Sequence, residues 1–113
     1  MHELAITEEV VRIVTDKAAA MKASRVASVE LVLGVLSGIV PDSVSFYFEH
    51  FSQGTPCQGA RLDFVRVSAV ARCRGCQHQF EPGEFDWTCP ECGHLGADIV
   101  AGKELAVASI ELE

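Results

Sequence analysis

Apolar side chains recur with helical spacing through the first part of the chain. They are separated by three, four or seven positions, and charged residues occupy the positions between them. The apolar positions are Leu4, Val11, Val14, Ala18 and Met21, and the charged ones are Glu8, Arg12, Asp16 and Lys22. This pattern predicts an amphipathic helix over residues 4–23, with Thr7 as a candidate internal cap near its start.

The hydrophobic period changes to two between residues 25 and 36. Alternate positions carry Ala27, Val29, Leu31, Leu33 and Val35 on one face, with more polar or smaller residues between them. Strict alternation is typical of a strand that buries one face. We therefore expect a strand over this segment, ended by Ser37-Gly38.

A second helix is indicated after the strand. Pro41-Asp42-Ser43 suits a first helical turn, because proline has the required φ and aspartate interacts favourably with the helix dipole. An apolar stripe follows, and Gly54 is a natural C-terminal stop. The stripe consists of Val44, Tyr47, Phe48 and Phe51.

Two further strands are expected, from Ala60 to the first cysteine pair and from Glu104 to Leu112. In each, the apolar positions alternate but change face partway along. A change of phase in both segments predicts bulges or strong coiling in two long strands that pair with each other.

The cysteines point to a metal site. Two C-x2-C pairs, Cys73/Cys76 and Cys89/Cys92, are separated by twelve residues. Each turn directs two thiolates at one point, which suits tetrahedral Zn²⁺, and four protein ligands leave no open position for catalysis. A redox dithiol or a rubredoxin-like iron site would use the same residue type. We favour one structural Zn(II) bound by these four cysteines.

Small residues and aromatics support a metal-stabilised lobe. Gly75 and Gly93 are expected to adopt positive φ and to let backbone N–H groups approach the sulfurs. Phe80, Phe85 and Trp87 are sufficient for only a very small core. The lobe should therefore depend on its metal for folding.

Three other side chains are candidate ligands or nucleophiles. His78 and His94 each follow a cysteine pair by two residues, so they are either surface histidines or exchangeable, pH-responsive neighbours of the metal. Cys57 stands apart from both pairs, with no base beside it, and is interpreted as a small packing residue.

Taken together, the elements predict an α+β fold. Two helices pack on a roughly three-stranded sheet, and a zinc-ribbon-like knuckle lobe is inserted between the last two strands. The expected domains are residues 1–71 plus 99–113, and the zinc-binding residues 72–98.

Composition and charge exclude several classes of function. The 113 residues carry 9 basic and 16 acidic side chains, and residues 73–98 contain Arg74 as their only basic group. Such a surface would repel nucleic acid.

No stretch of about 20 apolar residues and no secretory signal is visible, so a cytoplasmic protein without a membrane span is expected. The sequence has neither a nucleophile beside a base nor a phosphate-binding glycine loop, so no motif indicates an enzyme.

The amino terminus offers a second set of metal ligands. The α-amino group of Met1, the backbone nitrogen of His2 and its imidazole can surround one ion, with Glu3 completing the plane. A deprotonated amide with an imidazole favours Ni²⁺ or Cu²⁺ in tetragonal geometry over tetrahedral Zn²⁺. Judged by these residues alone, a histidine at position two is more often a polar terminus.

The combination of motifs resembles the HypA/HybF family over essentially the whole chain. The resemblance is carried by Met1-His2-Glu3-Leu4, by the apolar strand Val29–Gly34, and by the two cysteine pairs with Gly93-His94 after the second. It implies a nickel-binding α/β part joined to a zinc part. It also implies a metallochaperone, not an enzyme, that inserts Ni(II) during [NiFe]-hydrogenase maturation.

The same resemblance implies site residues and partners. His2, with Met1 and Glu3, would bind nickel, and the four cysteines would bind zinc. The expected partners are a nickel-handling GTPase and the large subunit of [NiFe]-hydrogenase. The oligomeric state stays open between monomer and homodimer. The competing hypothesis is a zinc-ribbon interaction module in which His2 has no role.

Overall fold

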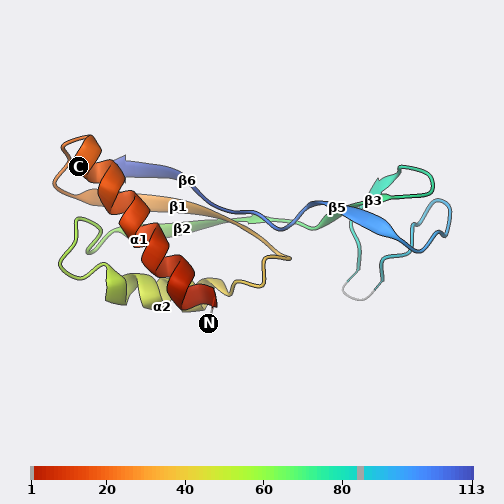
Figure 1. Ribbon diagram of the computed structural model, residues 1–113, viewed down its shortest axis with the longest axis horizontal. Coiled ribbons are helices and arrows are strands. Elements are labelled where there is room, and N and C mark those ends of the chain that lie inside the picture. The colour runs from red at the N-terminus through yellow and green to blue at the C-terminus, as the bar shows by residue number, and fades with distance from the viewer. Residues whose placement is uncertain (1, 84–85) are drawn as a thin grey trace. The chain divides into compact units, whose positions relative to one another are not determined.

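The computed structural model describes residues 2–83 and 86–113, without the side chain of His2. Within these residues, two helices and six strands follow one another. In order, they are α1 (His2–Ala20), β1 (Val26–Gly34), α2 (Pro41–Phe51), β2 (Arg61–Val67), β3 (Val70–Cys73), β4 (Gln79–Phe80), β5 (Ala97–Ala101) and β6 (Leu105–Leu112). Figure 1 shows them coloured from red at α1 to blue at β6. The predicted α+β class is confirmed.

The chain divides into two compact units. The helical unit comprises Met1–Val32, Gly38–Val65 and Ala106–Glu113, and the cysteine unit comprises Leu33–Ser37 and Arg66–Leu105. Three of the unit boundaries fall within β1, β2 and β6, and the fourth lies between Ser37 and Gly38. The functional division into a nickel-binding domain (1–71 plus 99–113) and a zinc-binding domain (72–98) stays a prediction.

One three-stranded sheet has the order β2-β1-β6, which confirms the expected number of strands. The prediction that β2 and β6 pair with each other is wrong for this sheet, because β1 lies between them. The central strand is the most buried of the three, and the prediction that it buries a single face is wrong. Val26 and Ser28 are buried as well as Val29 and Leu31, whereas Glu30 and Val32, on the same face as Val26, are half-buried.

Helix α1 confirms the first predicted helix with shifted ends, since it runs from His2 to Ala20 instead of over residues 4–23. It packs against α2, and both helices supply apolar residues to the core of the helical unit. Thr7 is fully buried, and its Oγ1 donates to the Glu3 carbonyl oxygen at 2.5 Å. The hydroxyl is thus satisfied inside the helix, and Thr7 is not a cap. Buried apolar residues of the helical unit include Val10, Val11, Val14, Ala18, Val26, Val29, Leu31, Ile39, Val44, Phe48 and Cys57.

Helix α2 begins at Pro41, as predicted. Val44 and Phe48 from the predicted stripe are buried, whereas Phe46 on the opposite side is 70% exposed. The helix ends at Phe51, before the predicted stop at Gly54. Gly54 instead takes φ +75° in the turn that follows.

The cysteine unit contains a second sheet, ordered β4-β3-β5, which the sequence did not reveal. Strand β3 pairs antiparallel with both neighbours, and Cys73 lies opposite Ala97 of β5. The predicted long strand from Ala60 is split into β2 and β3 at Ser68 and Ala69, a few residues after its apolar positions change face between Phe64 and Val65. The ladder between β3 and β5 also shifts register between Val70 and Ala71.

The apolar interior of the cysteine unit is very small. Leu33, Ala71, Cys73 and Cys89 are its buried hydrophobic residues among those that the structure describes. Of the three aromatic residues expected in its core, Phe80 and Trp87 are half-buried, and Phe85 lies outside the described residues. A unit with so little buried apolar area requires another source of stability. No helix in the described part of the chain is long and apolar enough to cross a membrane.

Candidate metal centre

The four paired cysteines converge on one point. Cys73 ends β3, and Cys76 follows in the adjoining turn. Cys89 and Cys92 lie in a second turn, between the bridged residues Thr88 and Leu95. Their four Sγ atoms all lie within 4.8 Å of one another.

The sulfur spacing fits a tetrahedral metal ion. The Sγ atoms of Cys73 and Cys92 are 3.6 Å apart, as are those of Cys76 and Cys89. A tetrahedron with Zn–S bonds of ~2.3 Å has S···S edges of ~3.8 Å. A disulfide would need ~2.05 Å, and none is formed. Iron in a rubredoxin-like site would use the same four thiolates. The four sulfur ligands therefore indicate a tetrahedrally coordinated ion that binds thiolate, which zinc and iron both are.

Backbone N–H groups surround the sulfurs. Gly75 and Cys76 donate to Cys73 Sγ at 3.2 and 3.4 Å, and Glu91 donates to Cys89 Sγ at 3.4 Å. The N–H groups of Cys76 and Gly75 lower the pKa of Cys73 to about 6, against the opposing effect of burial. These donors favour the thiolate, which is the form that binds metal.

The four thiols cannot all ionise without a counter-charge. The N–H of His78 lowers the pKa of Cys76, but burial and the neighbouring thiols Cys89, Cys92 and Cys73 outweigh it and raise that pKa to about 12. Thiolates at these separations repel one another, whereas a divalent cation among them would stabilise all four. The cluster therefore has the chemistry of a metal site.

The two turns share a backbone geometry that the sequence interpretation partly missed. Gly93 has φ +75°, as predicted, but its counterpart in the first turn is Gln77, with φ +68°, and not Gly75. Their N–H groups donate to the carbonyl oxygens of the first cysteine in each pair, Cys73 and Cys89, at 3.0 and 2.9 Å. Gln77 and Gly93 each follow the second cysteine directly, so this equivalence was available from the spacing.

Gly75 lies close to His94 of the second turn. A Cβ atom there would lie 3.3 Å from Cγ of His94, a tighter contact than side chains normally make. Glycine at this position thus lets the two turns approach each other around the thiols.

His78 and His94 are exposed, and neither belongs to the ligand cluster in the described residues. Their backbone N–H groups interact with the second cysteine of each pair, Cys76 and Cys92. The imidazole Nε2 of His78 lies 3.9 Å from Oε1 of Glu91. Both positions therefore contribute through the main chain, and side-chain exchange with the metal stays a prediction.

Cys57 lies outside the cluster. It is fully buried in the helical unit, and its Sγ is 3.8 Å from Oγ1 of Thr15. This placement agrees with the interpretation of Cys57 as a packing residue.

The amino-terminal ligands are only partly visible. Met1 and the side chain of His2 lie outside the described residues. His2 is the first residue of α1, and Glu3 is half-buried in the first turn of the helix. The nickel ligand set of Met1, His2 and Glu3 therefore stays a prediction.

Two known proteins that are similar to this chain have the same name. A "Hydrogenase maturation factor HypA" from Geobacter sp. (strain M21) is 45% identical over 113 residues, covering all of both chains. A protein of the same name from Dehalococcoides mccartyi (strain CBDB1) is 44% identical, covering all of this chain and 95% of that protein.

Solved structures show the same fold. "Solution structure of HypA protein" superposes with a TM-score of 0.76 at 25% identity and covers 100% of this chain and 97% of that one. The nickel metallochaperone HypA from Helicobacter pylori superposes with a TM-score of 0.69 at 24% identity, covering 97% and 96% of the two chains. The sequence model of a family described as "Hydrogenase/urease nickel incorporation, metallochaperone, hypA" matches residues 1–112. The chain therefore belongs to the HypA family of hydrogenase maturation factors, which are nickel metallochaperones and not enzymes.

Proposed function

We propose that this chain binds Ni(II) as cargo at its amino terminus and delivers it to the large subunit of [NiFe]-hydrogenase in the cytoplasm. A nickel-handling GTPase is the proposed partner in this transfer. The observation that carries the proposal is the family match over residues 1–112, because that family is described by nickel incorporation.

The proposed nickel ligands are the Met1 amine, the His2 backbone nitrogen and imidazole, and Glu3. Such nitrogen donors suit the tetragonal preference of Ni²⁺. A site at a chain end also leaves one side open, so that an incoming ligand from the client can bind before the old ligands leave.

The proposed role of the four cysteines is to hold a structural Zn(II). The 3.6 Å sulfur spacing and the N–H donors around Cys73 and Cys89 support it. A site with four thiolates has no open position, so it stabilises the cysteine unit without binding a substrate.

The test for nickel is a Ni²⁺ titration of untagged protein, beside His2→Ala and a variant with one glycine added before Met1. His50→Ala is the matched control, because His50 is an exposed histidine on α2. The native chain and His50→Ala should bind one tight Ni²⁺, and the other two variants should lose it. Equal nickel binding in the extended variant would contradict the terminal-amine site.

Metal analysis of the same four proteins tests the zinc assignment. One equivalent of zinc should be found in each, whether or not nickel binds. Iron in its place, recognised by thiolate-to-iron absorption, would contradict the zinc proposal. If all four proteins contain zinc but bind nickel equally, the competing hypothesis of a zinc-ribbon interaction module would be supported instead.

Delivery requires its own measurement. Nickel-loaded protein is mixed with metal-free hydrogenase large subunit, with and without the GTPase, and nickel in the separated large subunit is counted. Transfer from the native chain but not from His2→Ala is expected. Direct delivery would be contradicted if the large subunit received no more nickel from the loaded protein than from free Ni²⁺ at the same concentration.

A further inference from the structure

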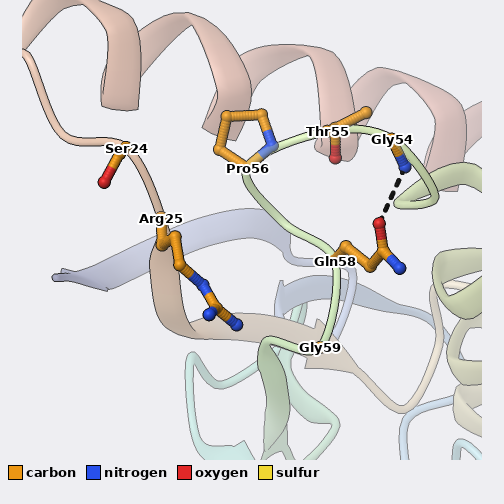
Figure 2. Close-up of a pocket in the computed structure, with 7 residues that line it drawn as sticks. All are labelled: Ser24, Arg25, Gly54, Thr55, Pro56, Gln58 and Gly59. Carbon is orange, nitrogen blue, oxygen red and sulfur yellow. Dashed lines mark hydrogen bonds between the residues drawn. The ribbon is translucent and has the colours of Figure 1, made fainter.

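The helical unit has an open cavity, and none of the proposed metal ligands is among its lining residues. Its volume is about 670 Å³, and it is formed by the segment between α1 and β1 and by the loop that follows α2 (Figure 2). Its lining residues are Ser24, Arg25, Gly54, Thr55, Pro56, Gln58 and Gly59. Arg25 is the only charged side chain in this lining.

The loop side of the cavity is held by hydrogen bonds. Thr55 Oγ1 donates to the Ser52 carbonyl oxygen at 2.7 Å and accepts from the N–H of Cys57 at 3.1 Å. The fully buried Cys57 anchors the loop in the core, and Val26 N–H donates to the Pro56 carbonyl oxygen at 2.9 Å. The two walls are therefore tied together, and the cavity is part of the folded structure.

The side chain of Gln58 is also fixed. Its Oε1 accepts from the N–H of Gly54 at 3.0 Å, as Figure 2 shows. Since a backbone N–H can only donate, this bond identifies the amide oxygen. The Nε2 group of Gln58 keeps its two hydrogens as donors.

Arg25 has a guanidinium available to a ligand. Its side chain extends toward Gly59 (Figure 2), where an added Cβ atom would lie 3.9 Å from NH2. Glycine leaves the wall beside this group free of a side chain. Among the described residues, Arg25 is paired only with the carboxylate of Glu113, whose Oε2 lies 3.8 Å from Nε, which is beyond hydrogen-bond distance.

Three arginines elsewhere in the described residues are more closely paired, and Arg66 and Arg72, which have no ion pair there, lie outside the cavity lining. Arg61 and Arg74 each lie 2.9 Å from an aspartate oxygen, and Arg12 is paired with two carboxylates on its own helix. Arg25 therefore differs from them in combining a cavity with a weakly paired guanidinium.

We propose that this cavity binds a carboxylate, presented by an acidic residue of a partner protein in an extended peptide segment. The planar fork of Arg25 matches a carboxylate in two parallel hydrogen bonds. A nucleotide or other polyanion would need several cations, but the lining supplies one and the chain has a net charge of −7. The cavity is larger than a carboxylate, so it also accommodates backbone on either side. The proposal does not depend on the proposed nickel transfer.

The test is a titration of the full zinc-loaded chain, followed by ¹H–¹⁵N NMR. The probes are N-acetylglutamate amide, its neutral match N-acetylglutamine amide, acetate and inorganic phosphate. The glutamate probe should bind tightest, with saturable shifts at Arg25, Gln58 and Gly59. The glutamine probe should cause none of these shifts.

Three variants separate the Arg25 fork from general charge. Arg25→Gln should weaken binding of the glutamate probe by about tenfold or more, because a charge-assisted pair is lost. Arg66→Gln removes the same charge from an exposed position outside the cavity and should have no effect. Glu113→Gln removes the carboxylate paired with Arg25 and should leave binding unchanged or tighter.

Several outcomes would overturn the proposal. Absence of saturable shifts up to tens of millimolar glutamate probe would exclude the site. Equal weakening by Arg66→Gln would indicate only general charge attraction. Acetate binding as tightly as the glutamate probe would identify a site for small acids, and tighter phosphate binding would identify an inorganic oxyanion site. Unchanged signals away from the cavity in Arg25→Gln would show that the variant is folded.

Discussion

Gly34 and Gly102 approach each other backbone to backbone in the cysteine unit. A Cβ atom on Gly34 would lie only 2.0 Å from the carbonyl oxygen of Gly102. That oxygen accepts from the N–H of Leu36 at 2.6 Å, and Gly34 N–H donates to the Glu104 carbonyl oxygen at 2.8 Å. Gly102 itself has φ +118°, a conformation that other residues rarely adopt. The end of β1 and the chain before β6 thus meet where no side chain fits.

This contact predicts that Gly34→Ala destabilises the protein by about 3 kcal/mol or more, because a backbone oxygen cannot move aside without breaking the pairing. Urea unfolding followed by circular dichroism measures the loss. Gly83→Ala is the control, since its added Cβ would make only an ordinary contact of 3.7 Å with Asp86. Equal stability of the two variants would refute the close approach.

The left-handed conformation of Gln77 predicts a stabilising substitution. Gln77→Gly should increase the free energy of unfolding by about 1 kcal/mol, because glycine has no Cβ to strain at φ +68°. Gln79→Gly makes the same chemical change in β4 and should instead destabilise by about 0.5–1 kcal/mol. Denaturant unfolding of the zinc-loaded proteins distinguishes the two. A loss of stability in both variants would contradict the turn geometry.

Two phenylalanines on α2 should differ strongly. Phe48 is 4% exposed, so Phe48→Ala should cost about 3–5 kcal/mol through the cavity it leaves. Phe46 is 70% exposed, and Phe46→Ala should change the stability by less than about 0.5 kcal/mol. Thermal or urea unfolding of the pair tests which face of α2 is buried, and a reversed order of stabilities would show that the assigned face is wrong.

Loss of the metal should unfold the cysteine unit selectively. Cys76→Ala leaves three thiolates, so bound zinc should fall and the amide signals of β3 and β5 should lose dispersion. The helical circular dichroism signal should remain, because α1 and α2 have their own core in the helical unit. A strong chelator should have the same effect on the native chain.

Cys57→Ala is the control for that experiment, because Cys57 is buried in the helical unit outside the cluster. It should keep the full zinc content while lowering the stability of the helical unit. Retention of zinc and of ordered β3 and β5 signals in Cys76→Ala would contradict the four-cysteine site.

The sequence by itself determined the helices, the central strand and the four clustered cysteines. The spacing of Val11, Val14 and Ala18 defined the face of α1, and Pro41 marked the start of α2. The two C-x2-C pairs identified the four thiols that the structure brings together. These features are local, because helical periodicity and metal-ligand spacing are properties of adjacent residues.

Tertiary structure alone decided how the strands pair and which backbone positions are special. That β1 separates β2 from β6, and that β5 pairs with β3, depends on contacts between segments far apart in the chain. Gln77 adopts positive φ because the fold of the turn imposes it, and glycine is required at Gly34 only because Gly102 lies against it. The cavity beside Arg25 likewise needs two distant segments. Such features follow from packing between elements, which the periodicity of a single segment does not encode.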